Sequence, residues 1–266
     1  MHPMLNIATR AARAAGDIIV RYVDRLDELN VASKERNDYV SEVDRRAEDA
    51  IIRILRKAYP DHGILAEESG IQAGSSDEYQ WIIDPLDGTT NFLHGFPQFS
   101  VSIALSHKGR LEQGVVYDPL RQELFTASRG NGAQLNNRRL RVAQRKGLEG
   151  ALLGTGFPFK THEHLEAYLG MFRDLLLETS GIRRPGSAAL DLAYVAAGRL
   201  DGFWELKLNP WDMAAGVLLI QEAGGIVGDF TGGHKFMQSG NVVAGNPKVF
   251  AAIVKKLRPH LTPEMG

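Results

Sequence analysis

The chain has 266 residues, of which 44% are hydrophobic and 24% charged, and these fractions are typical of a folded globular protein. Its 31 Lys and Arg residues against 32 Asp and Glu leave a net charge of −1, which does not favour nucleic acid or an anionic membrane as the main partner. The absence of cysteine excludes disulfides, thiolate metal sites and a cysteine nucleophile.

The apolar runs of the chain are short. The longest, Met213–Ile220, is far below the ~20 residues that a membrane-spanning helix needs. A chain without cysteine also suits a reducing compartment. We therefore expect a cytoplasmic protein that makes no membrane contact.

The first part of the chain combines helices with a sheet. Apolar residues at three- and four-residue steps predict helices over Leu5–Tyr22 and Val43–Ala58. Short apolar runs at Ile64–Ala66 and Trp81–Ile83 predict strands that end in acidic residues. The alternation over Ser100–Ser106, followed by closely spaced turns, predicts an antiparallel meander.

From about residue 147, predicted strands and helices alternate. Gly and Pro separate the elements, with Pro247 placed to begin the last helix. We therefore predict two tightly packed units: residues 1–146, with helices and an antiparallel sheet, and residues 147–266, with alternating strands and helices. The predicted fold class is mixed α/β (α+β), a layered sandwich.

The most informative segment begins where the strand Trp81–Ile83 meets two carboxylates three residues apart. Asp84 and Asp87 are separated by Pro85, which fixes one backbone angle, and are followed by Gly88, which permits a tight turn. Two converging carboxylates repel each other unless they share a proton or a cation. A shared proton would indicate an acid protease or glycosidase dyad, and a shared cation would indicate Mg²⁺ with oxygen ligands.

Two further acidic positions favour the cation. Glu67 and Glu68 follow the strand Ile64–Ala66, and Asp212 stands at the start of a predicted helix. Each feature alone has an ordinary explanation: a solvated turn for the glutamates, a helix cap for Asp212 and an Asx turn for Asp84 and Asp87. Three element ends that all terminate in carboxylates together favour a Mg²⁺ site.

These residues resemble a known family. Glu67-Glu68, the run from Asp84 to Asn91 and the run from Trp211 to Gly216 are similar to the signatures of the inositol monophosphatase family, in its bacterial SuhB type. The resemblance extends from about residue 5 to residue 257. It implies the αβαβα sandwich shared with fructose-1,6-bisphosphatase.

The resemblance also implies roles for individual residues. Glu67, Asp84 and the Leu86 carbonyl would hold a first Mg²⁺, and Asp84, Asp87 and Asp212 a second. A third, weaker ion would share Glu67 and Asp84. Thr89, backed by Asp44, would orient and help deprotonate the attacking water, with Glu67 also in the catalytic set. The substrate contacts would come from the following residues: Glu67, Leu86, Asp87, Gly88, Thr89, Arg183, Gly186, Ser187, Ala188, Glu205 and Asp212. The family also has a lysine and an aspartate ahead of the second helix, and Lys34 and Asp38 match these two positions loosely.

Several charged residues remain outside this assignment. The pair Arg183-Arg184 would touch substrate, stabilise a subunit interface or lie in a solvated turn. The basic stretch Arg138–Lys146 indicates a charged sheet edge protected against strand pairing, or a docking patch for RNA or an acidic protein. Asp191 stands in the middle of a predicted helix and would hydrogen-bond within the core.

The function implied by the resemblance is Mg²⁺-dependent hydrolysis of inositol monophosphates and related polyol phosphates, inhibited by Li⁺. A fructose bisphosphatase or 3′-phosphonucleotide phosphatase of the same fold is a lesser alternative. The SuhB type also implies a second role, in which the protein binds NusA and RNA polymerase during antitermination of ribosomal RNA transcription and its phosphatase activity is dispensable. We expect a homodimer, with Phe157–Phe159 and the helix Leu165–Leu177 as candidate contacts.

Overall fold

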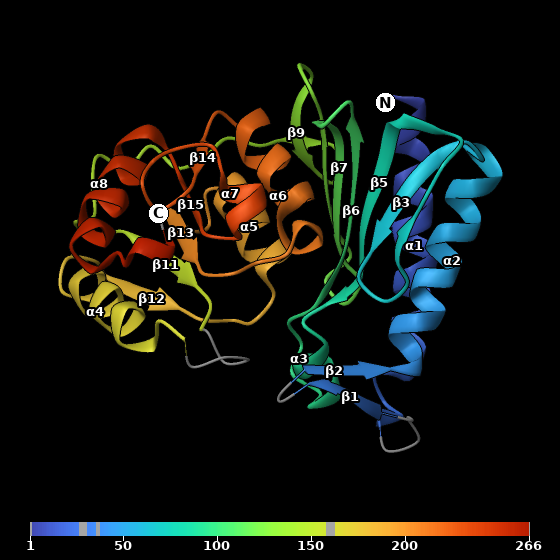
Figure 1. Cartoon of the computed structure of the whole chain (residues 1–266), viewed down its shortest axis with the longest axis horizontal. Coiled ribbons are helices and arrows are strands. Elements are labelled where there is room, and N and C mark those ends of the chain that lie inside the picture. Colours follow the sequence, from blue (N-terminus) through green and yellow to red (C-terminus); the bar gives the residue numbers. More distant parts are fainter. Residues whose placement is uncertain (1, 27–30, 36–37, 158–162, 266) are drawn as a thin grey trace.

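The computed structural model of the chain describes residues 2–26, 31–35, 38–157 and 163–265, without side chains over 31–40. Helices and two β-sheets alternate in layers across the molecule (Figure 1). The longer helices are α1 (Pro3–Tyr22), α2 (Glu42–Ala58), α4 (Leu165–Leu176), α5 (Ala188–Ala196), α6 (Pro210–Glu222) and α8 (Pro247–Leu257). The short ones are α3 (Thr89–Leu93) and α7 (Phe236–Ser239), followed by two 3₁₀ turns, Arg258–His260 and Pro263–Met265.

The first outer layer is the helix pair α1 and α2, which pack against each other and against the first sheet. Pro3 stands at the start of α1, where its missing N–H is not needed. The start of α2 is closed by a capping box, in which the Asp44 carboxylate accepts hydrogen bonds from the N–H and hydroxyl of Ser41. The apolar stripes of both helices lie in one core cluster with the inner face of the sheet.

The first sheet has eight strands in the order β10-β9-β8-β7-β6-β5-β3-β4. Strands β6 to β10 form the predicted antiparallel meander, β5 extends it by a further antiparallel strand, and β3 runs parallel to β5. The strands are β3 (His62–Ala66), β4 (Gly70–Gln72), β5 (Ser76–Asp87), β6 (Ser100–His107), β7 (Arg110–Asp118), β8 (Glu123–Ser128), β9 (Gly132–Leu135) and β10 (Arg138–Arg139). A separate hairpin joins β1 (Val31–Glu35) to β2 (Asp38–Ser41).

The second sheet has five strands in the order β12-β11-β13-β15-β14. They are β11 (Leu152–Thr155), β12 (Gly181–Arg183), β13 (Gly202–Glu205), β14 (Ile226–Gly228) and β15 (Val242–Gly245). Helices α5 and α6 lie between the two sheets, and α4 and α8 form the far outer layer (Figure 1). The layer order is therefore αβαβα, which confirms the predicted fold.

The two middle helices approach each other closely because one of them carries a glycine. A Cβ added at Gly216 of α6 would lie 2.5 Å from the Cβ of Leu192 in α5. The boundary predicted between residues 146 and 147 falls between the two sheets, and α6 packs against strands of both. The middle layer thus holds the second half of the chain against the strands that carry the first acidic residues.

The predicted surface features lie as follows. Arg138 and Arg139 form β10, at the edge of the eight-stranded sheet, as the charged-edge interpretation predicts. Leu177, just after α4, is 78% exposed, whereas Pro158 and Phe159 of the proposed dimer contact lie outside the described residues. No helix within the described parts of the chain is both long and apolar enough to cross a bilayer.

Candidate functional site

A β-bulge in β5 turns Asp84 and Asp87 toward the same face of the sheet. Asp84 stands opposite Ser102 of β6 and Asp87 stands opposite Ser100, so two residues of β5 oppose only one residue of β6. In a regular strand, residues three apart point to opposite faces, and the extra residue restores a common face. The strand was predicted to end at Ile83; it continues through Asp87 because the bulge accommodates Pro85, which has no N–H to donate.

Glu67 comes to the same place from the neighbouring strand. Because β3 is parallel to β5, with Ala66 opposite Ile83, both strands deliver their next residue to the same edge. The Glu67 N–H donates to the Ile83 carbonyl at 3.1 Å. The buried Glu48 of α2 accepts hydrogen bonds from the N–H groups of Glu68 and Ser69, both at 2.9 Å, and thereby fixes the turn that carries Glu67.

Asp212 enters from the middle layer, on the first turn of α6. It is not the residue that precedes the helix, as a simple cap would be; it is the third helical residue, and its carboxylate accepts the N–H of Asn209 at 2.6 Å. One face of the same turn packs on β6, where the Ser102 hydroxyl donates to the Trp211 carbonyl at 3.2 Å. Both halves of the chain therefore contribute to one acidic group.

Burial and mutual repulsion dominate the electrostatics of this group. The pKa of Asp84 lies well above its usual value because of burial, and because Glu67, Asp87 and Asp212 disfavour a further negative charge. The pKa of Asp212 is raised by burial and then by the charges of Asp87 and Glu67. Burial raises the pKa of Asp87 to about 6, even though hydrogen bonds from Ser187 and from the start of α5 lower it.

This donor set fits a hard divalent cation. Carboxylate and carbonyl oxygens are the ligands that Mg²⁺ prefers, and a bound cation would replace repulsion by attraction. Within the described ranges, no three Asp, Glu or His side chains are already at metal-ligand spacing. Carboxylates repel one another in the absence of a cation, and a bound ion would draw them closer together. The residues that could hold it are Glu67, Asp84, Asp87, Asp212 and the carbonyl of Leu86.

Thr89 and Asp44 form a hydrogen-bonded pair beside these carboxylates. The Thr89 hydroxyl lies 2.9 Å from one oxygen of Asp44 and 3.1 Å from the Leu86 carbonyl. The other oxygen of Asp44 is held by the N–H of Ser41 at 2.8 Å and by its hydroxyl at 2.5 Å. Burial raises the pKa of Asp44 against these hydrogen bonds. The carboxylate that caps α2 is thus also the acceptor for Thr89.

Gly88 shapes the turn between β5 and α3. Its φ of 96° lies in the left-handed region, and an added Cβ would stand 2.9 Å from the Gln98 carbonyl and 3.2 Å from the Gly186 carbonyl. The turn leaves the first N–H groups of α3 without acceptors inside the helix. Such groups are suited to binding the oxygens of an anion.

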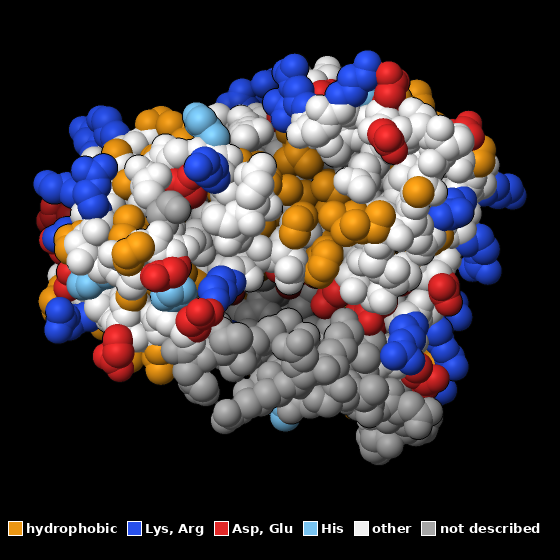
Figure 2. Space-filling model, in the orientation of Figure 1, with side chains coloured by type: hydrophobic (Ala, Val, Ile, Leu, Met, Phe, Trp, Pro, Cys, Tyr) orange, Lys and Arg blue, Asp and Glu red, His pale blue; other side chains and the backbone are white. Residues whose placement is uncertain are grey.

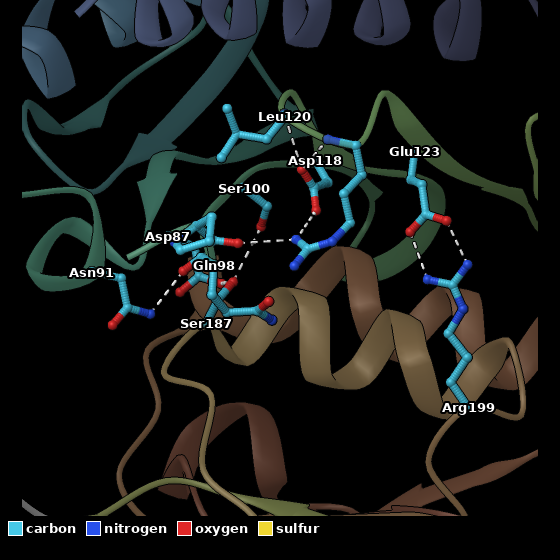
Figure 3. A network of polar contacts seen from close by, with 11 residues as sticks. Asp87, Asn91, Gln98, Ser100, Asp118, Leu120, Glu123, Ser187 and Arg199 are labelled. Carbon is cyan, nitrogen blue, oxygen red and sulfur yellow. Dashed lines mark hydrogen bonds and ion pairs between the residues drawn. The ribbon is translucent and has the colours of Figure 1, made fainter. Parts of the chain in front are cut away.

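Asp87 connects the acidic group to the second half of the chain (Figure 3). One of its oxygens accepts the Ser187 hydroxyl at 2.5 Å and the Ala189 N–H at 2.8 Å, at the start of α5. Asn91 makes a second connection, because its amide donates to the carbonyls of Gln98 at 2.7 Å and Pro185 at 2.8 Å. The loop before α5 is therefore fixed directly against the turn that follows β5.

These residues surround a cavity of about 500 Å³. Acidic side chains lie near the middle of the face that Figure 2 shows. Of the predicted site residues, the following line the cavity: Glu67, Asp84, Leu86, Asp87, Gly88, Thr89, Gly186, Ser187, Ala188, Glu205 and Asp212. Asp44 lies behind Thr89 and reaches the cavity only through it.

Arg183 is exposed on β12 and does not line the cavity of this chain, so its predicted contact with the substrate stays a prediction. Successive residues of an extended segment point to opposite sides, and it is Arg184 that lines the wall, with its guanidinium 5.0 Å from the ring centre of Phe157. The side chains of Lys34 and Asp38 lie outside the described residues.

Several residues that line the cavity had no predicted site role, among them Thr90, Asn91, Asp191 and Asn209. Asn91 stands inside the Asp84–Asn91 motif, so its motif position was an available signal. Asp191 was placed in the core, and its side chain is indeed only 1% exposed. Only the tertiary structure shows that it also reaches the cavity wall.

The raised pKa of Asp87 makes a testable prediction about stability. In the metal-free protein this group is protonated below pH 6, whereas its unfolded value is 3.8, so the folded state binds more protons between these values. The free energy of unfolding should therefore fall with rising pH, by about 1.4 kcal/mol per pH unit for this group. Asp84 and Asp212 should continue the fall to higher pH.

Thermal unfolding of EDTA-treated protein between pH 4 and pH 8 measures this slope. Asp87→Asn should reduce the slope, and excess Mg²⁺ should raise the Tm more at pH 7.5 than at pH 5. If the Tm of the metal-free protein rises with pH through this range, the pKa values of these aspartates are not raised in the folded state.

Comparison with known proteins agrees with this geometry. The model of the inositol monophosphatase family matches residues 1–262. A relative from Pseudomonas aeruginosa named Nus factor SuhB is 61% identical over 269 aligned residues, which cover 100% of this chain and 99% of the relative. The solved structure of the extragenic suppressor protein SuhB from Bartonella henselae superposes with a TM-score of 0.95 at 47% identity, over 98% of this chain and 100% of that one. The Thermotoga maritima IMPase superposes with a TM-score of 0.88 at 37% identity, over 98% and 99% of the two chains. The chain belongs to the inositol monophosphatase family.

Proposed function

We propose that this chain is a Mg²⁺-dependent phosphatase that hydrolyses inositol monophosphates and related polyol monophosphates. Membership of the family supports a metal-dependent phosphatase. The observation that carries the proposal is the convergence of Glu67, Asp84, Asp87 and Asp212 on one cavity, beside a turn whose N–H groups suit an anion. A phosphate monoester dianion needs such an arrangement, since it repels nucleophiles and hydrolyses extremely slowly in water.

In this proposal the carboxylates hold the metal ions. Glu67, Asp84 and the Leu86 carbonyl would hold one Mg²⁺; Asp84, Asp87 and Asp212 would hold another; and a third, weaker ion would share Glu67 and Asp84. When bound, Mg²⁺ would neutralise phosphate charge, lower the pKa of a water molecule and stabilise the leaving alkoxide.

Thr89 and Asp44 would orient the water molecule. A hydroxyl has one hydrogen to donate and two lone pairs. While Thr89 donates its hydrogen to Asp44, its oxygen is free to accept a hydrogen bond from water near the Leu86 carbonyl. Asp44, whose raised pKa favours proton uptake, would then receive the proton through Thr89.

The remaining lining residues would bind the substrate. The N–H groups that follow Gly88 would hold phosphate oxygens, and Gly186, Ala188 and Glu205 would face the hydroxyl-bearing part. The Ser187 hydroxyl donates to Asp87, so we assign Ser187 a positioning role in addition to contact with the substrate. A fructose bisphosphatase or 3′-phosphonucleotide phosphatase would use the same metal site with different contacts at this end of the cavity.

The central prediction of this proposal concerns Asp87. Asp87→Asn keeps an acceptor for Ser187 and α5 but removes a charge from the second metal site, so kcat/KM for inositol 1-phosphate should fall roughly 100-fold or more. Without metal, the Tm of the variant should be equal to or above that of the unaltered protein, because the substitution removes a buried carboxyl group whose pKa is raised. The matched control is Asp77→Asn, an exposed carboxylate at the start of β5, which should leave both values unchanged. Full activity of Asp87→Asn, or undiminished activity of the unaltered protein in EDTA, would contradict the proposal.

We also propose a second role, in which the protein acts as a partner in transcription antitermination through NusA and RNA polymerase. The observation that favours it is the name Nus factor SuhB of a relative 61% identical over the whole chain. Exposed arginines outside the cavity, including Arg138, Arg139 and Arg141, are available for a salt-sensitive contact. The expected homodimer belongs to this proposal as well.

The two roles should be separable by mutation, because the exposed arginines lie outside the cavity. Asp87→Asn should abolish turnover yet restore growth of a strain that lacks the gene, whereas Arg138→Glu should keep turnover and fail to restore growth. Arg184 is unsuitable for this test because it lines the cavity. Equal cellular abundance of the variants, checked by immunoblotting, is the necessary control. If Asp87→Asn fails to restore growth at normal abundance, the enzymatic role alone accounts for the requirement.

A further inference from the structure

The segment that leads into α6 is held by hydrogen bonds at both of its ends. At one end, the Lys207 N–H donates to Oδ1 of Asn241 at 3.3 Å. At the other end, the Asn209 N–H donates to the Asp212 carboxylate at 2.6 Å. Lys207 and Asn209 line the cavity, whereas Asn241 does not. The segment therefore connects a residue outside the cavity to a proposed ligand of the second metal ion.

Between these ends, the backbone of the segment lies directly against the turn that precedes β15. The Leu208 N–H donates to the Gly240 carbonyl at 2.9 Å, and a Cβ added at Gly240 would stand 2.3 Å from the Leu208 carbonyl oxygen. Lys207 has a φ of 56°, in the left-handed region that is unfavourable for residues other than glycine. Such a conformation persists where the surrounding structure holds it. The contact with this turn therefore determines the path of the chain into α6.

Asn241 is buried, with 4% of its surface exposed, and its side chain bonds on two sides. While Oδ1 accepts the Lys207 N–H, Nδ2 donates to the Met265 carbonyl at 3.2 Å. The Met265 side chain is itself buried, in the same core cluster as Leu206. The turn Pro263–Met265 thus holds both Asn241 and the residue that begins the segment.

We propose that Asn241 is a positioning residue for Asp212, and that the Pro263–Met265 turn holds Asn241 in place. The affinity of the second metal site then depends on a contact outside the cavity. This inference rests on the proposed function, because it concerns a ligand of the proposed Mg²⁺ site. Mg²⁺ requires nearly ideal ligand positions, and the groups that orient its ligands affect its affinity strongly, so a small displacement of Asp212 weakens binding.

Asn241→Ala in the full-length protein removes both side-chain hydrogen bonds and tests this role. The Mg²⁺ dissociation constant of the second site, measured by titration calorimetry without substrate, should rise roughly tenfold, because supporting contacts of metal ligands have effects of this size. Hydrolysis of inositol 1-phosphate should need correspondingly more Mg²⁺ and should recover when Mg²⁺ is saturating.

The same titration in an Asp87→Asn background assigns the effect to the second site. That background lacks a ligand of the second site, so the Mg²⁺ binding that remains is at Glu67 and Asp84. Asp87→Asn and the double variant Asp87→Asn/Asn241→Ala should therefore bind this remaining Mg²⁺ equally well.

The matched control is Asn246→Ala. Asn246 follows β15 directly, as Asn241 precedes it, and is buried to a similar degree. Its side chain donates to the carbonyls of Ala143 at 2.8 Å and Arg145 at 2.9 Å, and it lies outside the cavity. Both substitutions should lower the Tm of the metal-free protein, but only Asn241→Ala should weaken Mg²⁺ binding.

Met265→Ala is a second variant, which keeps the test decisive if Asn241→Ala does not fold. It leaves the Met265 carbonyl in the chain but removes the buried side chain that holds the turn. Mg²⁺ binding should weaken in the same direction. The double variant should bind Mg²⁺ about as well as the weaker single variant, since both substitutions act through one contact.

Two results would overturn the inference in distinguishable ways. If the unaltered protein binds Mg²⁺ and hydrolyses inositol 1-phosphate, but the Asn241 and Met265 variants lower the Tm without weakening Mg²⁺ binding, these residues act on stability alone and the proposed function stands. If the unaltered protein neither binds Mg²⁺ nor hydrolyses the ester in its presence, the proposed function fails and this inference fails with it.

Discussion

The structure depends on the gathering of four acidic side chains at one point, two of them buried and two half-buried. Glu67, Asp84, Asp87 and Asp212 come from two strands and one helix. Burial raises the pKa of the three aspartates, and repulsion from neighbouring carboxylates raises those of Asp84 and Asp212 further. Isolated buried carboxylates are strongly unfavourable, so a fold that keeps them together needs a compensating cation or shared protons. The bulge in β5, the parallel pairing of β3 with β5 and the capping box of α6 each serve to bring one of these groups into place.

The supporting contacts explain why both halves of the chain are needed. Asp87 accepts the Ser187 hydroxyl and an N–H at the start of α5, so the middle layer is fixed to the first sheet through a site residue (Figure 3). Farther along, Arg199 after α5 forms an ion pair with Glu123 of β8 at 2.5 Å. In the first half of the chain, Asp44 both caps α2 and accepts a hydrogen bond from the Thr89 hydroxyl. Groups that stabilise the fold are therefore the same groups that position the candidate chemistry.

Much of this site is predictable from the sequence because its residues stand in short, ordered motifs next to apolar strands. The fold and the cavity-lining positions of Asp84, Asp87, Gly88 and Asp212 agree with that prediction. The motifs could not show the features that depend on tertiary structure. The bulge depends on how β5 pairs with β6, and the choice between Arg183 and Arg184 depends on which side of an extended segment faces inward. The position of Asp191 in the cavity wall depends on how α5 lies between the sheets.

Diffraction from crystals soaked in Mn²⁺ shows whether the acidic group holds divalent cations. Mn²⁺ prefers the same oxygen ligands as Mg²⁺ and scatters anomalously. We expect at least two anomalous peaks, one beside Glu67 and Asp84 and one beside Asp84, Asp87 and Asp212, with the second absent in Asp87→Asn. Crystals that retain the fold and contain millimolar Mn²⁺, yet show no peak beside these carboxylates, would contradict the proposed metal site.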